Sequence, residues 1–261
     1  MGDDSASLRV DRTGAALTIR FQRPPANAFD VPMAEALRRH LELAAGDAGI
    51  RCVCLTGSGR FFSAGQDVST IAQASPDVVR RALDEIYHPL ILLLRSMSTP
   101  ILAAVNGPAA GMGLGLALAA DVRLAARSAR FVFGFSSLGL TSDCGVSLLL
   151  AGWIGAGRAL SMALLEEPLD AEQAHAAGLV AAVAADEDLA AEAGAWAQRL
   201  ATGPTRAYAL TKQAINEAVF PDLARRLAGE ASRQALAAGT ADAGEGVRAF
   251  LEKRPPVFRG A

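Results

Sequence analysis

Residues Pro100 to Asp121 read PILAAVNGPAAGMGLGLALAAD, and the expected fold is built around them. The apolar run from Ile101 to Val105 ends at Asn106-Gly107-Pro108, which predicts a buried strand followed by a turn. A helix should come next, although each glycine costs a helix roughly 1 kcal/mol relative to alanine. Glycines at positions 111, 113 and 115 favour a helix N-terminus that approaches a negatively charged ligand closely. Tight packing of a buried helix explains them equally well.

Composition excludes several classes of protein. The chain has 261 residues, 51% of them apolar and 20% charged, which is enough for one large globular domain or one domain with an appendage. A net charge of −2 with scattered basic residues argues against a nucleic-acid partner. The apolar run after Pro100 is nearly long enough to cross a membrane, but its prolines and glycines argue against a span. We therefore predict neither a nucleic-acid nor a membrane partner.

Cysteine and histidine usage predicts a cytoplasmic protein without a metal site. Residues 1–7, MGDDSAS, lack the basic and then apolar order of a secretory signal. The three cysteines have no disulfide-framework spacing, and the three histidines have no metal-ligand spacing. These residues are Cys52, Cys54 and Cys144, and His40, His88 and His175.

Apolar periodicity predicts the remaining elements. Strands are expected as a hairpin over 8–21 and over 52–55, 122–126, 130–135 and 179–183. Helices are expected over 31–45, 75–97, 145–165, 169–178 and 189–252, the last with breaks at Gly203-Pro204, Pro221 and Gly239. Strands alternate with helices only up to residue 184, which predicts an α/β body with a helical tail. We divide the chain at residue 200, into 1–200 and 201–261.

Two glycine-bearing turns each follow a predicted strand: Phe62 to Asp67 and Ala110 to Gly113. If the two strands are neighbours, backbone N–H groups of both turns converge as in an oxyanion hole, which stabilises the enolate of a thioester. A dinucleotide fingerprint does not fit, because Leu116 stands at its third glycine position.

Asp143 lies in the otherwise apolar segment from Leu138 to Gly145. A carboxylate in such surroundings has a raised pKa and can act as a general base. Alternatively, Asp143 caps the helix that starts near Gly145. Cys144 is interpreted as a small packed residue. Tyr87 and His88 either line an acyl pocket or belong to the core or surface.

Taken together, these motifs resemble the enoyl-CoA hydratase/isomerase family, the crotonase superfamily. The matching residues occur in family order over almost the whole chain: Arg23-Pro24, Asn27-Ala28, Phe62 to Asp67, Ala104 to Gly113, Ala119 to Arg123, Ala129 to Phe131, Leu138 to Leu140, Ala171 to Gly178 and Phe250 to Arg254. The resemblance implies a spiral of ββα turns over 1–200. It also implies that the helices of 201–261 build a homotrimer or a dimer of trimers and cover coenzyme A.

The resemblance also implies site residues. The oxyanion hole would consist of the N–H groups of Ala64 and Met112, with Asp143 as the third catalytic residue. An acyl-CoA substrate, with coenzyme A as part of the substrate and no other cofactor, would contact Arg23, Ala26, Ala28, Ser63, Ala64, Gln66, Asp67, Val68, Gly111, Met112, Phe135, Leu138, Phe250 and Lys253.

Departures from the family pattern indicate the reaction. The two glutamates that activate water in hydratases fall on Gly115 and Phe135, which cannot ionise. Asp143 falls where isomerases and the dehalogenase of the family keep an aspartate, and residues 131–165 most resemble the 1,2-epoxyphenylacetyl-CoA isomerases. We therefore expect an acyl-CoA isomerase in which Asp143 moves the proton. The alternatives are a hydratase-type reaction or thioester hydrolysis, and a non-catalytic CoA-binding homologue.

Overall fold

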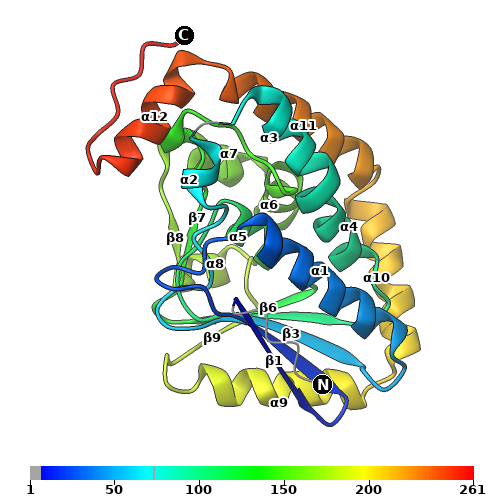
Figure 1. The fold of residues 1–261 in the computed structure, drawn as a ribbon. Helices are drawn as coiled ribbons and strands as arrows, with labels where there is room; N and C mark the ends of the chain where they lie inside the picture. The colour runs from blue at the N-terminus through cyan, green and yellow to red at the C-terminus, as the bar shows by residue number, and fades with distance from the viewer. Residues whose placement is uncertain (1–6, 73) are drawn as a thin grey trace.

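The computed structural model describes residues 7–72 and 74–261, so the expectation drawn from residues 1–7 lies almost entirely outside it. Its main sheet has the strand order β1-β2-β3-β4-β6-β9 (Figure 1). These strands are β1 Leu8–Thr13, β2 Ala16–Phe21, β3 Cys52–Gly57, β4 Ile101–Val105, β6 Val122–Ala126 and β9 Ala182–Ala184. The hairpin β1-β2 is antiparallel and every later pair is parallel. This confirms the predicted α/β body.

Helices cover both faces of this sheet (Figure 1). On one face, α1 Val31–Gly46, α4 His88–Ser96 and α5 Met112–Ala119 pack over the strands. On the other face lies α9 Leu189–Thr202. Because side chains alternate along a strand, Cys52 and Cys54 face α9 while Val53 and Leu55 face the larger core. The free cysteines are thus small packed residues.

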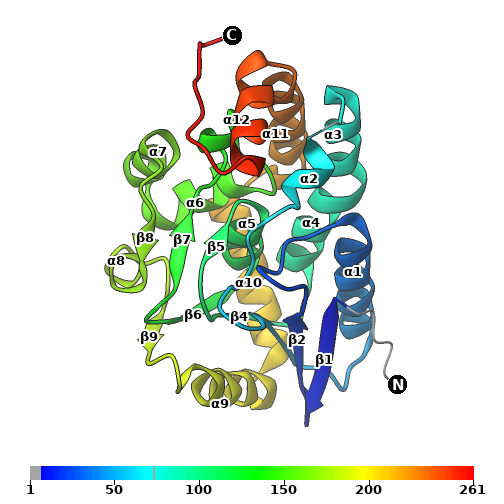
Figure 2. The same ribbon diagram turned by 60° about the vertical axis from the view of Figure 1, so that its left-hand side comes forward.

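A smaller sheet and further helices complete the fold. The small sheet has the order β5-β7-β8. Its strands are β5 Ala109–Ala110, β7 Arg130–Val132 and β8 Leu169–Asp170. The further helices are α2 Val68–Ile71, α3 Pro76–Ala82, α6 Val146–Ile154, α7 Ala156–Leu165, α8 Ala171–Ala176, α10 Thr205–Val219, α11 Leu223–Ala238 and α12 Ala241–Leu251. In Figure 2, α11 lies beside α3, and α12 lies beside α2.

Two of the predicted strands have different limits in the structure. The strand predicted over 130–135 stops at Val132, because the backbone turns at Gly134 with φ +73°. The strand predicted over 179–183 is β9, Ala182–Ala184. Leu179 instead donates its N–H to the carbonyl of Ala174, which ends α8, and its apolar side chain fills the core.

The helix predicted over 75–97 is interrupted by a π-helical turn, η1 Leu83–Tyr87. Ser75 caps its start and Pro76 follows at the first helical position, as the sequence predicts. Pro89 has no N–H to donate to the preceding turn. The wider turn accommodates it, since the N–H of His88 donates to Leu83, five residues back.

The C-terminal helices break at the three predicted places, between α9, α10, α11 and α12. Residue 200 falls inside α9, and the division of the chain there stays a prediction. The apolar run after Pro100 forms β4 and the eight-residue α5. Among the residues the structure describes, no helix is both long enough and apolar enough to cross a membrane.

Candidate active site

The two glycine-bearing turns lie against each other, as predicted for neighbouring strands. β3 and β4 pair in parallel, so the chain after each strand emerges at the same edge of the sheet. A β-bridge joins Ser63 to Ala109, and the N–H of Ala110 donates to the Ser63 carbonyl at 3.0 Å. A Cβ on Gly65, which has φ +92°, would lie 3.2 Å from the Met112 nitrogen and 2.7 Å from the Ala110 oxygen. Only glycine permits this approach.

The backbone donors at this contact correct one sequence prediction. The Ala64 N–H, expected in the oxyanion hole, donates to the Ala26 carbonyl at 2.9 Å and is therefore occupied. Gln66 is bridged to Phe29, but the hydrogen bonds of this bridge are made by its neighbours: Gly65 accepts the Phe29 N–H and Asp67 donates to the Phe29 carbonyl. The N–H of Gln66 itself has no acceptor in the described chain. The Met112 N–H, at the first turn of α5, likewise has none. The pair of free donors is therefore Gln66 and Met112.

The loops predicted to hold coenzyme A are adjacent. Arg23 donates to Asp67 at 2.8 Å and to the Ala28 carbonyl at 3.0 Å, so it ties the loop 23–28 to the turn 62–67. Asp67 also caps α2, and its hydrogen bonds with Ser69 and Arg23 lower its pKa. Val68 begins α2 directly beside it.

Ser63 has a structural role in this turn. Its side chain is fully buried, its hydroxyl donates to the Asn27 carbonyl at 2.8 Å, and it accepts the Gly65 N–H at 3.1 Å. The sequence predicts that Ser63 contacts the ligand, and the full burial of this residue argues against that contact. The groups of this turn that remain available to a ligand are therefore backbone N–H groups.

Leu138, Phe250 and Lys253 lie on or beside the last helix, α12. A Cβ on Gly246 of α12 would meet the Leu138 carbonyl carbon at 2.4 Å, so α12 packs tightly on η2, the 3-10 turn Ser136–Leu138. Phe250 is 57% exposed, and Lys253 is exposed just after the helix. Contact of these two residues with coenzyme A stays a prediction.

Asp143 lies in a loop that packs onto α5. A Cβ on Gly115 would lie 2.8 Å from the Cys144 carbonyl oxygen and 3.0 Å from the Cys144 Cβ. Cys144 has φ +51°, a left-handed conformation that is rare for residues other than glycine. Strain of this kind costs on the order of 1–3 kcal/mol and is found where surrounding contacts enforce a functional geometry.

The Asp143 side chain is 5% exposed and accepts the Gln234 amide at 3.0 Å. Burial raises the pKa of this carboxyl to about 6, against hydrogen bonds from Cys144 and Gln234 that lower it. In the part of the chain that the structure describes, no cation lies within ion-pair distance of it. The carboxylate is therefore buried and basic, as the sequence predicts.

The helix-cap interpretation of Asp143 is wrong. The residue before α6 is Gly145, with φ +77°, and no side chain at this position caps the helix. The N–H groups of Gly145 and Ser147 instead donate to Glu230, which reaches over from α11. The Asp143 side chain is thus left available for another role.

Two positions expected to carry glutamates in a hydratase are closed by packing. Gly115 faces the Cys144 backbone, as described above. Phe135 is buried, and its ring lies 3.7 Å from the Cβ position of Gly111 and 5.0 Å, centroid to centroid, from the Phe133 ring. An apolar ring therefore borders the turn that precedes Met112.

The π-helical turn places Tyr87 and His88 in the interior beside this site. Burial raises the pKa of Tyr87, and the neighbouring Cys144 and Asp143 add to the effect. His88 accepts the Cys144 N–H at 3.3 Å through Nε2, and burial lowers its pKa to about 4. Both residues are buried, Tyr87 at 1% exposure and His88 at 3%, so of the alternatives left open by the sequence the structure supports a place in the core.

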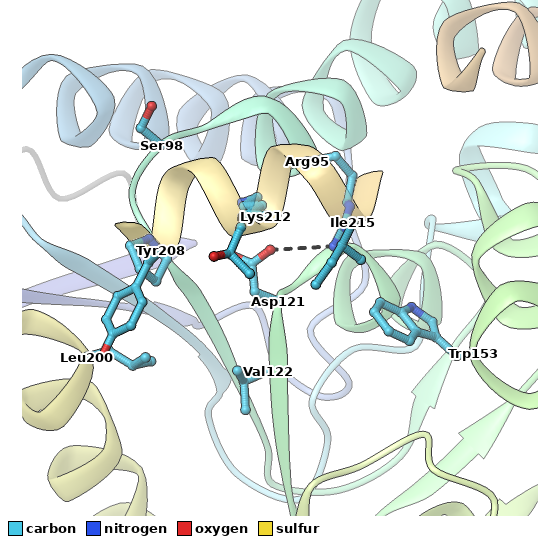
Figure 3. Close-up of a pocket in the computed structure, with 11 residues that line it drawn as sticks. Arg95, Ser98, Asp121, Val122, Trp153, Leu200, Tyr208, Lys212 and Ile215 are labelled. Atoms are coloured by element: carbon cyan, nitrogen blue, oxygen red, sulfur yellow. Dashed lines mark hydrogen bonds and ion pairs between the residues drawn. The ribbon is translucent and has the colours of Figure 1, made fainter. Parts of the chain in front are cut away.

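A cavity of about 220 Å³ lies at the other end of α5, away from these residues. Figure 3 shows Asp121 in its lining, with Arg95, Lys212 and Trp153 around it. Asp121 pairs with Lys212 at 2.9 Å and with Arg95 at 3.5 Å. None of the predicted site residues lines this cavity. In the described chain, no three His, Cys, Asp or Glu side chains gather as metal ligands.

Paired free backbone N–H groups and a buried carboxylate are the groups that a protein forming the enolate of a thioester requires. Residues 11–261 match the family model described as enoyl-CoA hydratase/isomerase, and the chain belongs to this family. The fold is the crotonase-like ββα spiral, since the chain superposes on an enoyl-CoA hydratase from Mycobacterium avium subsp. paratuberculosis with a TM-score of 0.86. That structure is 35% identical, over 97% of this chain and 98% of the other.

Curated relatives include both isomerases and hydratases. The chain is 44% identical to the 1,2-epoxyphenylacetyl-CoA isomerase of Escherichia coli K12, over 94% of this chain and 95% of that protein. It is 34% identical to the 2,3-dehydroadipyl-CoA hydratase of the same organism, over 98% and 99%. An acyl-CoA activity is thus supported, while the reaction type is a separate question.

Sequence reasoning missed Glu230, Gln234 and the role of the Gln66 backbone. The signal for the two α11 residues was weak: polar side chains at positions 230 and 234, one helical turn apart, fall on the face that packs inward. Which loop they contact follows only from the tertiary structure.

Proposed function

We propose that this protein is an acyl-CoA isomerase with a single carboxylate as its acid and base. The thioester carbonyl would accept hydrogen bonds from the N–H groups of Gln66 and Met112. Because Met112 is the first residue of α5, the helix dipole would also favour the negative charge of the enolate oxygen. Asp143 would remove a proton from the carbon next to the thioester, forming an enolate. The same carboxyl would return that proton elsewhere, so that a double bond migrates.

The observation that carries the proposal is the contact between Gly115 and Cys144. A hydratase needs a second acid or base to hold water, and at this position the space for one is filled by the loop of Asp143. A proton shuttle needs only one base. The similarity to the 1,2-epoxyphenylacetyl-CoA isomerase supports the same reaction class and extends it to opening of a three-membered ring.

Deuterium exchange tests the proposal. Wild type and Asp143→Asn are incubated in heavy water with a 3-enoyl-CoA, and the products are analysed by mass spectrometry. We expect double-bond migration with exchange in wild type and the loss of both in the variant. Rapid hydration of crotonyl-CoA by wild type would instead show a hydratase, and release of free coenzyme A a thioesterase.

Because coenzyme A is part of the substrate, this proton shuttle would need no further cofactor. We also propose that the protein assembles as a homotrimer or a dimer of trimers and that it acts in the cytoplasm. Exposed apolar side chains on α7 and on the C-terminal helices support self-association, since large exposed apolar patches mark interaction sites. They include Leu160, Leu164, Leu165, Leu210, Ile215 and Leu236. Light scattering on the purified protein measures the number of chains.

A further inference from the structure

We propose that Gln234 is a positioning residue that holds one oxygen of Asp143 and leaves the other to receive the substrate proton. The inference rests on the proposed function of Asp143. It concerns a helix 91 positions later in the sequence, α11, whose inward face carries two buried polar side chains, Glu230 and Gln234.

Both ends of the Gln234 amide are occupied. Its Oε1 accepts the Thr141 N–H at 3.0 Å, and its Nε2 donates to Oδ2 of Asp143 at 3.0 Å. Because a backbone N–H can only donate, the amide oxygen must face Thr141 and the NH₂ group must face Asp143. The orientation of the amide is thus fixed by the backbone of the loop that it holds.

Glu230 fixes the same loop on the other side of Asp143. Its Oε2 accepts the Gly145 N–H at 2.7 Å, and its Oε1 accepts the Ser147 N–H at 3.0 Å together with the Ser147 hydroxyl. Two α11 side chains therefore hold four backbone or side-chain donors around the strained Cys144. This accounts for how a left-handed conformation is maintained there.

The hydrogen bonds select one oxygen of Asp143. Oδ2 has the Gln234 amide, whereas no N–H or O–H of the described residues donates to Oδ1. The other hydrogen-bonding group beside this carboxyl is the Cys144 thiol, which is only a weak donor. A neutral amide orients a carboxylate without cancelling its charge, so the group keeps most of its basicity. A lysine or arginine in the same place would favour the ionised form much more strongly.

Four other titratable groups lie around Asp143, and the titration of each could contribute to the pH profile that the test measures. Tyr87 comes from η1, His88 from the start of α4, Cys144 from the same loop and Glu230 from α11. Burial raises the pKa of Glu230 to about 7, above that of Asp143. Variants at Gln234 leave all four groups in place.

Two substitutions with opposite electrostatic effects test the proposal. In Gln234→Met the donor is lost, and the acid limb of the kcat/KM profile should move up by about one pH unit. In Gln234→Lys an ammonium replaces the amide, and the limb should move down. In both, kcat should fall about tenfold while KM stays within about twofold, because the oxyanion turn is untouched. Gln198→Met is the matched control, since its amide donates to Thr13 at the surface.

Equal losses of activity with an unmoved acid limb in both variants would overturn the proposal and leave Gln234 a structural residue. Carbon-13 NMR of the Asp143 carboxyl, assigned with Asp143→Asn, gives a second readout that needs no substrate. If wild type moves no double bond, the proposed function fails. The NMR titration then still decides whether Gln234 controls this carboxyl, by an upward shift in Gln234→Met and a downward shift in Gln234→Lys.

Discussion

The two ends of α5 lie near carboxylates in opposite electrostatic settings. Asp121, after the C-terminal end, pairs with Lys212 and Arg95 and accepts the Ile101 N–H at 2.8 Å. Asp143, whose loop packs on the N-terminal half of α5 at Gly115, has only the neutral donor Gln234 and the Cys144 thiol beside it. Asp121 thus forms ion pairs, whereas the buried Asp143 with its neutral donors retains affinity for a proton.

The surroundings of the C-terminal end show what that setting stabilises. Arg123 donates to the Ala120 carbonyl at 2.7 Å and Trp153 to the Leu118 carbonyl at 3.1 Å, so the last carbonyls of α5 have cationic or polar partners. This arrangement anchors the helix at one end. At its other end, the N–H groups of the first turn have no partner within the helix and can be presented to a ligand. The comparison supports a structural role for Asp121 and is consistent with the catalytic role proposed for Asp143.

The largest effect is expected for Asp143→Asn. Asparagine has the same shape but cannot accept the proton, and a general base contributes on the order of 10²–10⁴ in rate, so we expect about a 10³-fold loss of kcat. Initial rates of double-bond migration measure it. Residual activity within tenfold of wild type would contradict the role of Asp143.

Gly115→Glu tests whether the closed space at α5 defines the reaction. The new side chain must displace Cys144, whose oxygen lies 2.8 Å from the Cβ position, and with it Asp143. A misplacement of about 1 Å can cost 10²-fold, and we expect a loss of that order in isomerisation without any gain in crotonyl-CoA hydration. Gly115→Ala, with a smaller displacement, is the graded control. A hydratase created by the glutamate would refute this account of the packing.

Asp121→Asn should show the reverse pattern, a loss of stability with activity retained. The substitution leaves Arg95 and Lys212 with an uncompensated positive charge in a largely buried place. Breaking a buried pair costs roughly 3–5 kcal/mol, and partial exposure of Asp121 reduces the expected cost to about 2–3 kcal/mol of unfolding free energy. Chemical denaturation measures it. A stable but inactive variant would reverse the assignments of the two carboxylates.

The pH dependence of stability tests the surroundings of Asp143 independently of activity. The pKa of Asp143 is raised in the folded state to about 6 from its ordinary value of 3.8, so the fold favours the protonated form. Its contribution to the unfolding free energy is therefore present at low pH and is lost as pH rises from about 4 to 6, by up to about 3 kcal/mol. Asp143→Asn should not show this loss.

Denaturation of both proteins at pH 4 and pH 8 provides the measurement, and taking the difference between them cancels the titrating groups that do not interact with Asp143. Glu230 does interact with it, because the Asp143 charge helps to raise the pKa of Glu230, so its titration contributes to the difference. We expect Asp143→Asn to gain on wild type as the pH rises. A difference that does not change with pH would mean that the buried carboxyl has an ordinary pKa.

The site has a backbone half, the N–H groups of Gln66 and Met112, and a side-chain half, Asp143 with its α11 partners, and the sequence predicts the two halves to different extents. The glycine-bearing turns are local, and glycines at fixed distances after a strand predict free backbone donors. Among these donors, the assignment of Ala64 instead of Gln66 does not hold. That error arose because the Ala26 carbonyl, 38 positions earlier, takes the Ala64 N–H. Asp143 was predicted as a buried base, but its partners on α11 were not. Local periodicity carries no information about which loop a distant helix contacts.

Gln66→Ala should have the smallest effect and tests the backbone half of the site directly. Alanine keeps the N–H of residue 66, and the bridge to Phe29 uses neighbouring groups, so the donor keeps its place. We expect kcat within about threefold of wild type, because backbone donors, which supply about 10²-fold or more each at an oxyanion, survive a side-chain change. Isomerase assays at saturating substrate measure kcat. A loss of 10²-fold would mean that the Gln66 amide itself binds the reacting group, and the contrast between a backbone half and a side-chain half of the site would no longer hold.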